Sequence, residues 1–184
     1  MVRRSWRDAR AQMVVGQHGM GAAEVKTYKS FGALARAFER ALIELQPAYA
    51  AAMESGALLV EAAAKAEFGH YQRENMGELT PWAELKDATK QAHIQAIVDG
   101  EAAPDAGENT PELVTGALRA SIKHESTAKS FAVGSESEIM VWQELGTPEG
   151  LPPRPVLGTA MYRSEEAVVD LIGRAVVNTI TGKK

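Results

Sequence analysis

Residues 144–160 read ELGTPEGLPPRPVLGTA, and three of the four prolines, Pro152, Pro153 and Pro155, flank the single arginine Arg154. A proline has no backbone donor and fixes its own φ, so this run cannot lie inside a helix or a central strand. Each proline also pushes the residue before it toward extended geometry. We therefore expect a semi-rigid, polyproline-like connector that holds Arg154 at a defined angle. A helix can begin directly after it, either at Pro155 or with Thr159 as its cap.

An arginine held in this way is suited to an ion pair with a carboxylate. A fixed guanidinium favours a bidentate pair, either within the fold or across a subunit boundary. Glu144 is the nearest acidic candidate in the motif. The alternative is that Arg154 is solvated and the prolines only turn the chain, because a surface ion pair contributes little.

Upstream of the connector, apolar residues recur at helical spacing over residues 30–68. Ser30 is a suitable cap for a first helix, which we expect to end at Gln46. Pro47 can then open a second helix, the long central helix of the domain, whose small and apolar stripe runs to about Phe68. Gly69 supplies the C-terminal stop.

The middle of the chain predicts another helix and then an acidic loop. Thr80 and Pro81 have the chemistry of a cap and a first turn for a helix through about Val98. Residues 99–112 carry five carboxylates and no Lys or Arg, namely Asp99, Glu101, Asp105, Glu108 and Glu112. This pattern predicts an acidic surface loop, which is either simply solvated or, in a ring, a rim that repels DNA phosphates.

Short strands follow. Residues 118–123 alternate between apolar and polar side chains, residues 131–134 read as a second strand, and residues 139–144 read as a third strand or as a helical turn. Consecutive short strands pair most simply as an antiparallel meander, for which we expect three to five strands. The closing residues repeat as an amphipathic helix.

The predicted fold class is therefore α+β. An antiparallel sheet of a few strands is packed by a long central helix and a C-terminal helix, with an extended N-terminal arm. We expect the arm at residues 1–27 and a single domain at residues 28–184, because 184 residues are enough for one real core.

The composition excludes several classes of protein. The chain has no Cys, which excludes a disulfide scaffold and Cys-based zinc sites and suits a reducing cytoplasm. We expect no signal peptide and no transmembrane span, because the most apolar run, residues 48–66, is interrupted by charges. The formal net charge of −4 argues against a dedicated nucleic-acid binder.

The N-terminal residues place basic side chains beside an aromatic one. Arg3, Arg4, Arg7 and Arg10 are spaced by one, three and three residues around Trp6. On a helix they would form a basic stripe. The segment is either a frayed, solvated terminus or an arm that docks on a neighbouring subunit or an acidic surface such as DNA. Glycines at positions 16, 19 and 21 predict a hinge after it.

No catalytic pattern emerges from the chain. The four histidines show no metal-ligand spacing, and Glu67 with His70 forms a lone Glu-x-x-His that lacks the second copy a di-iron bundle needs. There is neither a nucleophile elbow nor a Gly-Lys-Thr phosphate loop. We expect no cofactor, no metal and no enzymatic activity.

The order of the motifs nevertheless resembles a known family. It consists of VGS at residues 133–135, ELGT at 144–147, PRPVL at 153–157 and a closing helix, preceded by TGALRASI at 115–122 and WAEL with Thr89 at 82–89. This order is similar to that of the tail-completion, or neck, proteins of tailed bacteriophages, which join the head to the tail. Two positions depart from the family pattern: Trp142 stands near a usual Tyr, and Val156 stands at a usual Phe.

The resemblance implies a structural virion protein, assembled in the bacterial cytoplasm. It implies a homo-oligomer, most simply a hexameric ring, between a head-side connector or stopper protein and a tail terminator or tail tube protein. Genomic DNA would pass through the lumen without sequence-specific binding. The alternative function is a small DNA-binding accessory protein or an enzyme. The interface candidates are Arg3, Arg4, Trp6, Arg7, Glu144, Gly146, Thr147, Pro153, Arg154 and Pro155.

Overall fold

The computed structural model describes residues 11–14 and 25–182. The longest element is helix α1 (Phe31–Ala66), of 36 residues and about 54 Å at 1.5 Å per residue. It begins where the sequence predicts, because the Ser30 side chain accepts a hydrogen bond of 3.2 Å from the Ala33 backbone N–H. The arm residues Arg3, Arg4, Trp6 and Arg7 lie outside the described residues.

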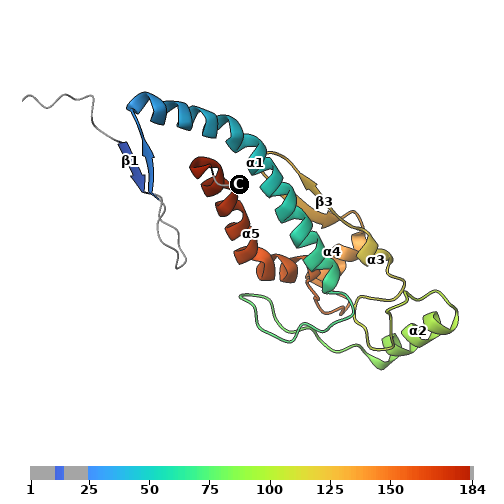
Figure 1. Ribbon diagram of the computed structural model, residues 1–184. Coiled ribbons are helices and arrows are strands. Elements are labelled where there is room, and N and C mark those ends of the chain that lie inside the picture. The colour runs from blue at the N-terminus through green and yellow to red at the C-terminus, as the bar shows by residue number, and fades with distance from the viewer. Residues whose placement is uncertain (1–10, 15–24, 183–184) are drawn as a thin grey trace, which may run out of the picture.

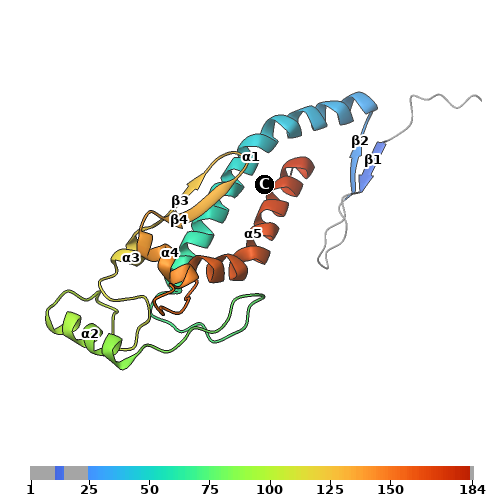
Figure 2. The same ribbon diagram turned by 180° about the vertical axis from the view of Figure 1, so that it is seen from behind.

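The predicted break at Pro47 is wrong, since Pro47 lies inside α1. A proline removes one helical hydrogen bond, here the one to the carbonyl of Ile43. Both Pro47 and Ile43 are exposed, so water can satisfy that carbonyl. Figures 1 and 2 show α1 bending between its N-terminal and C-terminal halves, as a proline inside a helix produces.

Helix α5 (Val156–Thr181) and a β-hairpin pack against α1. The hairpin joins β3 (Ile122–Ser126) to β4 (Phe131–Ser135) in antiparallel register, with Ile122 opposite Ser135. A second hairpin pairs β1 (Ala11–Val14) with β2 (Val25–Tyr28) before α1 begins (Figure 1). The α+β class, with a long helix and a C-terminal helix on an antiparallel sheet, is confirmed.

The sheets are smaller than the predicted meander of three to five strands. Among the described residues each sheet has two strands. Residues 139–144, predicted as a strand or a helical turn, belong to helix α4 (Glu138–Leu145). The segment before β3 forms the helical turn α3 (Ala117–Ala120), which follows Gly116 at a φ of +79°. Alternation alone could not separate this turn from the strand after it.

Helix α2 (Asp87–Val98) begins later than predicted. Residues 80–86 are not helical, and the Trp82 N–H donates to the Gln72 carbonyl at 2.9 Å. This pairing buries Trp82 and Leu85 in the position where a first helical turn was expected. His93 is the buried residue of α2, whereas Ile97 is exposed.

The core lies at one end of the molecule. It gathers side chains from the end of α1, from β3, from α4 and from the start of α5, including Phe68, Trp82, Ile122, Met140 and Val156. In the N-terminal half of α1 the buried residue is Ala41. Half of the longest helix therefore projects beyond the core. No helix in the described part of the chain is long and apolar enough to cross a membrane.

Candidate functional site

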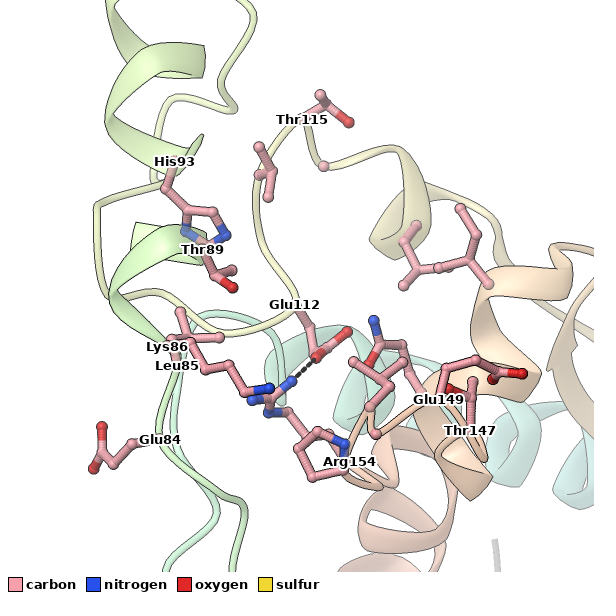
Figure 3. Close-up of a pocket in the computed structure, with 18 residues that line it drawn as sticks. Glu84, Leu85, Lys86, Thr89, His93, Glu112, Thr115, Thr147, Glu149 and Arg154 are labelled. Atoms are coloured by element: carbon pink, nitrogen blue, oxygen red, sulfur yellow. Dashed lines mark hydrogen bonds and ion pairs between the residues drawn. The ribbon is translucent and has the colours of Figure 1, made fainter. Parts of the chain in front are cut away.

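Arg154 is the centre of the candidate site and is buried, with 5% of its surface exposed. Its backbone N–H donates to the Gln143 carbonyl at 2.6 Å, which ties the connector to α4. Its Nε and Nη2 donate to the Ala83 carbonyl at 3.3 and 3.1 Å. Its Nη1 lies 3.5 Å from Glu112 Oε1 (Figure 3). The guanidinium therefore joins three distant parts of one chain.

This arrangement decides between the expectations for Arg154. The ion pair lies within the fold, so a solvated arginine is excluded. The carboxylate that pairs with Arg154 is Glu112, and the prediction of Glu144 is wrong. The pair has a single contact and is not bidentate, because Nε and Nη2 of the guanidinium donate to the Ala83 carbonyl. Only the folded loop shows that Glu112 comes to lie opposite Arg154.

Glu112 itself is buried, with 3% of its side chain exposed. Its backbone has a φ of +61°, which is unusual for a residue with a side chain. Burial raises the pKa of its carboxyl group to about 7, and the charge of Arg154 only partly opposes this. Glu112 therefore exchanges its proton near neutral pH. The prediction that residues 99–112 form a solvated acidic loop is wrong for this residue.

The other acidic residues of that loop behave as predicted or pair locally. Asp99, Glu101, Asp105 and Glu108 are exposed. Asp105 accepts two hydrogen bonds from Arg119, at 2.6 and 3.0 Å. Hydrogen bonding from Arg119 lowers the pKa of the Asp105 carboxyl group. The loop thus keeps an acidic surface while its last carboxylate turns inward.

Glu144 has a different role from the one expected. Its carboxylate accepts hydrogen bonds from the backbone N–H groups of Leu157 and Gly158, the latter at 3.3 Å. These are free donors in the first turn of α5, where a negative charge also interacts favourably with the helix dipole. Glu144 therefore caps α5 from the end of α4, across the connector.

The connector is shaped by backbone contacts around Gly146 and Thr147. Gly146 has a φ of +72°, and a Cβ atom there would lie 2.7 Å from the Leu151 carbonyl oxygen. Its N–H donates to Trp142 at 2.8 Å, and the Thr147 N–H donates to Leu151 at 3.0 Å. Pro153 and Pro155 complete the turn into α5, with Pro155 as its cap residue. The connector is therefore ordered, as predicted.

A cavity of 540 Å³ lies beside this connector (Figure 3). Its walls include Leu85 and Thr89, Thr115 and Gly116, and Thr147 and Arg154. These residues come from three segments of the chain, residues 82–89, 115–122 and 144–157. The fold brings the three elements to one place, although they are far apart in the sequence. Gln143 also lines the cavity, and its buried Oε1 has no hydrogen-bond partner among the described residues.

A second polar cluster joins α1 to the hairpin. His124 of β3 contacts Glu61 through Nδ1 and lies 3.2 Å from Glu54 through Nε2. Ser126 donates to Glu54, and Lys65 to Glu61. Hydrogen bonds to the two carboxylates raise the pKa of His124. Sequence analysis missed this cluster, although Glu54 and Glu61 share a helix face and residues 124 and 126 share a strand face.

No group of three ligating side chains in the described residues is arranged to hold a metal ion. In the cluster of Glu54, Glu61 and His124, the imidazole of His124 contacts both carboxylates directly. Glu67, the carboxylate of the Glu-x-x-His pattern, pairs with Arg163 at 2.7 Å. Burial raises the pKa of the Glu67 carboxyl group, against the opposing charge of Arg163.

The outer surface of α4 carries four exposed apolar side chains beside the exposed Glu138. Ile139, Val141, Trp142 and Leu145 are exposed, with Leu145 at 76%, whereas Met140 points into the core. Exposed apolar side chains that gather on one element often mark a site of interaction with another protein. We call these four side chains the α4 patch. It directly precedes the connector in the sequence.

Comparison of the chain with protein-family models, with curated proteins and with solved structures finds no match.

Proposed function

We propose that this chain is a structural virion protein of a tailed bacteriophage that forms a ring at the junction of head and tail. The observation that carries the proposal is the α4 patch, held in a fixed position by the connector next to it. The resemblance of the sequence motifs to tail-completion proteins supports this class of assembly. The α4 patch supplies a surface with which such an assembly can be built.

The connector makes the α4 patch a rigid surface. Arg154 ties the connector to Gln143 of α4, and Glu144 ties the end of α4 to the start of α5. Exposed apolar side chains on a fixed backbone lose little conformational freedom on association, so more of their burial appears as affinity. Trp142 provides the kind of aromatic anchor found at the energetic centre of interfaces.

Convergence of the family-like elements provides further support. Residues 82–89, 115–122 and 144–157 each contribute to the cavity beside Arg154. The fold brings these three segments together although they lie far apart in the sequence. Here they support the connector, and through it the orientation of α4. This reading gives the motifs a positioning role and requires no reaction.

One observation favours an enzymatic alternative. Glu112 titrates near neutral pH in a cavity that also holds Arg154 and His93, and shifted pKa values of this kind also occur at catalytic centres. The structure gives Glu112 another role, because it is the carboxylate that faces the buried Arg154. Saturating the chain with small carboxylate, phosphate and peptide substrates and finding no turnover would remove this alternative.

As part of this proposal, the ring is a hexamer through which genomic DNA passes. A head-side connector or stopper protein lies on one side, and a tail terminator or tail tube protein on the other. The net charge of −4 and the exposed carboxylates of residues 99–108 fit a channel that lets DNA pass without binding it. The protein would be found in the virion neck after assembly in the bacterial cytoplasm.

Electron microscopy of the purified full-length chain, combined with a DNA-binding assay over a range of salt concentrations, tests the proposal. A closed ring with a central opening and no salt-sensitive DNA binding is the expected result. A monomer that binds DNA with an affinity falling steeply as salt rises would favour the DNA-binding accessory protein instead.

A further inference from the structure

We infer that the cavity beside Arg154 is the binding site for the N-terminal arm of a neighbouring copy, with the indole of Trp6 as its occupant. This inference rests on the proposed ring and identifies a contact between successive copies in it. It starts from three properties of the cavity, which are its lining, its unpartnered acceptor and the charge of the segments around it.

The cavity has the size and the lining of a site for a largely apolar group. Its volume of 540 Å³ lies within the range of ligand pockets, about 300–1,000 Å³. Leu85, Val114, Leu118, Ile139 and Leu151 provide apolar walls. An aromatic side chain can fill such a space at a small cost in conformational freedom, because only two torsions fix its position.

One polar group in the wall lacks a partner. Gln143 lines the cavity, and its buried Oε1 accepts no hydrogen bond from the described residues. An unpaired buried acceptor costs free energy, so an occupant that donates a hydrogen bond there is favoured. The indole of tryptophan combines an apolar ring with one N–H donor and no acceptor. The cavity therefore suits tryptophan better than phenylalanine or a charged side chain.

The segments that form the cavity are acidic. Residues 84–116 contain seven Asp or Glu against two Lys and no Arg, and residues 136–153 contain four Glu and no Lys or Arg. Among the lining residues, Glu84 and Glu149 are exposed, as is Lys86. Arg154, the other cation of the lining, is already engaged by a buried carboxylate. An occupant carried by a basic segment is therefore favoured.

Of the three tryptophans in the chain, Trp6 meets both requirements. Trp82 is buried in the core. Trp142 is exposed, but it belongs to the acidic residues 136–153 and to the helix that itself forms a wall of the cavity. Trp6 lies within residues 1–10, which contain four Arg against one Asp. The basic side chains around Trp6 would meet the acidic segments around the cavity.

The arm that fills the cavity belongs to another copy. Trp6 lies five residues before Ala11 of β1, and five extended residues reach at most about 18 Å. Figures 1 and 2 place β1 beside the start of α1, and α2, which carries Thr89 and His93 of the cavity, beyond the other end of α1. The arm is therefore too short to reach its own cavity. An arm seated in the next copy makes a heterologous contact, which generates a ring when the rotation closes.

Cysteine cross-linking tests the contact directly, because the chain has no cysteine of its own. Ser5→Cys keeps Trp6 in place, and Thr89→Cys lies at an exposed position of the cavity wall. The two full-length variants are purified separately, mixed and oxidised. We expect a mixed dimer at a yield on the order of tenfold above that of either variant alone. Ser55→Cys, exposed on α1, replaces Thr89→Cys in the control mixture and should give background yield.

A double-mutant cycle tests the role of the indole. Trp6→Ala should weaken self-association, measured by analytical ultracentrifugation, on the order of thirtyfold. Trp6→Phe keeps the ring and loses the N–H, so it should weaken association about fivefold. Gln143→Met removes the acceptor and should cause a similar loss without lowering the melting temperature.

Combining Trp6→Phe with Gln143→Met should cause little further loss, because both changes remove the same hydrogen bond. Ser5→Ala, next to Trp6 in the arm, is the matched control and should leave self-association unchanged.

Several outcomes overturn the inference. They are a mixed cross-link no stronger than that of the Ser55→Cys control, self-association that Trp6→Ala leaves unchanged, losses from Trp6→Phe and Gln143→Met that simply add, and a chain that stays monomeric at every concentration. A ring that keeps its stability with Trp6→Ala refutes this contact and leaves the proposed function standing. The proposed function fails separately, if the chain is absent from the necks of tailed particles.

Discussion

Replacing Arg154 with methionine should destabilise the fold strongly, and more at pH 8 than at pH 5. Methionine keeps much of the side-chain volume and removes the charge and the donors. The Ala83 carbonyl then loses its donors, and Glu112 loses the cation opposite it. Removing one partner of a buried pair costs about 3–5 kcal/mol.

The pH dependence follows from the raised pKa of Glu112. Burial raises this pKa from 4.5 to about 7, so between these values the folded chain holds a proton that the unfolded chain releases. The free energy of unfolding therefore falls as pH rises through this window, by about 3 kcal/mol in all. At pH 5 Glu112 is neutral in the fold, so losing the charge of Arg154 matters less there. Glu112→Gln should remove this contribution to the pH dependence.

We expect Arg154→Met to lower the free energy of unfolding by about 4 kcal/mol at pH 8 and by about 2 kcal/mol at pH 5. The smaller value reflects the lost hydrogen bonds alone. For a chain of this size the larger loss lowers the melting temperature by about 8–16 °C. Urea and thermal unfolding, followed by circular dichroism, measure both values. The double variant with Glu112→Gln should lose less than Arg154→Met alone at pH 8. A loss below about 1 kcal/mol, or an equal loss at both pH values, would refute this account of the site.

The remaining predictions concern the connector, the hairpin and the arm. Glu144→Ala should cost about 1 kcal/mol by uncapping α5, seen as a small fall in melting temperature, and no fall would mean that water replaces the cap. Gly146→Ala should lower the free energy of unfolding by more than about 2 kcal/mol, because it adds backbone strain and a clash with the Leu151 carbonyl. Gly100→Ala, also at positive φ but with open space around it, should lower it by about 1 kcal/mol. Equal losses would contradict the role of the Leu151 carbonyl. The pKa of His124, measured by NMR titration, should lie above its usual value of 6.5. The protonated imidazole therefore contributes fully to stability below pH 6.5, and this contribution declines as pH rises through the raised pKa. A measured pKa at or below 6.5 would show that the contacts of His124 with the two carboxylates are absent in solution. Deleting residues 1–22 removes β1, but it should leave the circular dichroism of the domain at residues 28–184 intact and weaken attachment to a partner. Unchanged particle assembly after this deletion would make the arm a solvated tail.

The parts of the fold that the sequence predicts well are those set by local chemistry. Ser30 caps α1, the prolines around Arg154 form an ordered connector, and a helix starts after Pro155. In each case a single residue type restricts the backbone strongly, whatever surrounds it. The strand at residues 131–134 follows from a similar local signal.

The predictions that fail depend on tertiary contacts. Pro47 does not end α1, because its exposed position leaves the unpaired carbonyl in water. Trp82 lies in an extended segment, since pairing with Gln72 and burial outweigh the capping signal before it. Residues 139–144 form a helix that buries Met140 and leaves Trp142 exposed, whereas a strand would place residues 140 and 142 on the same face. Local propensity is a weak constraint beside contacts of this kind.

The site shows the same division. The sequence identifies Arg154 and its need for a carboxylate, but it cannot identify Glu112, which lies 42 residues away in a loop that reads as solvated. The cluster of Glu54, Glu61 and His124 needs the hairpin to lie on α1 before its members meet. Spacing within one element suggests which residues share a face, and only packing decides which faces meet.

The central claim is that this chain builds a ring in the neck of a tailed particle. Cryo-electron microscopy of tailed particles from the source of this gene, with an epitope tag on the chain and tag-specific labelling, tests it most directly. We predict a ring of density at the head–tail junction that carries the label and fits copies of this fold with α4 toward the neighbouring copy. Particles whose necks are complete and carry no label would contradict the claim.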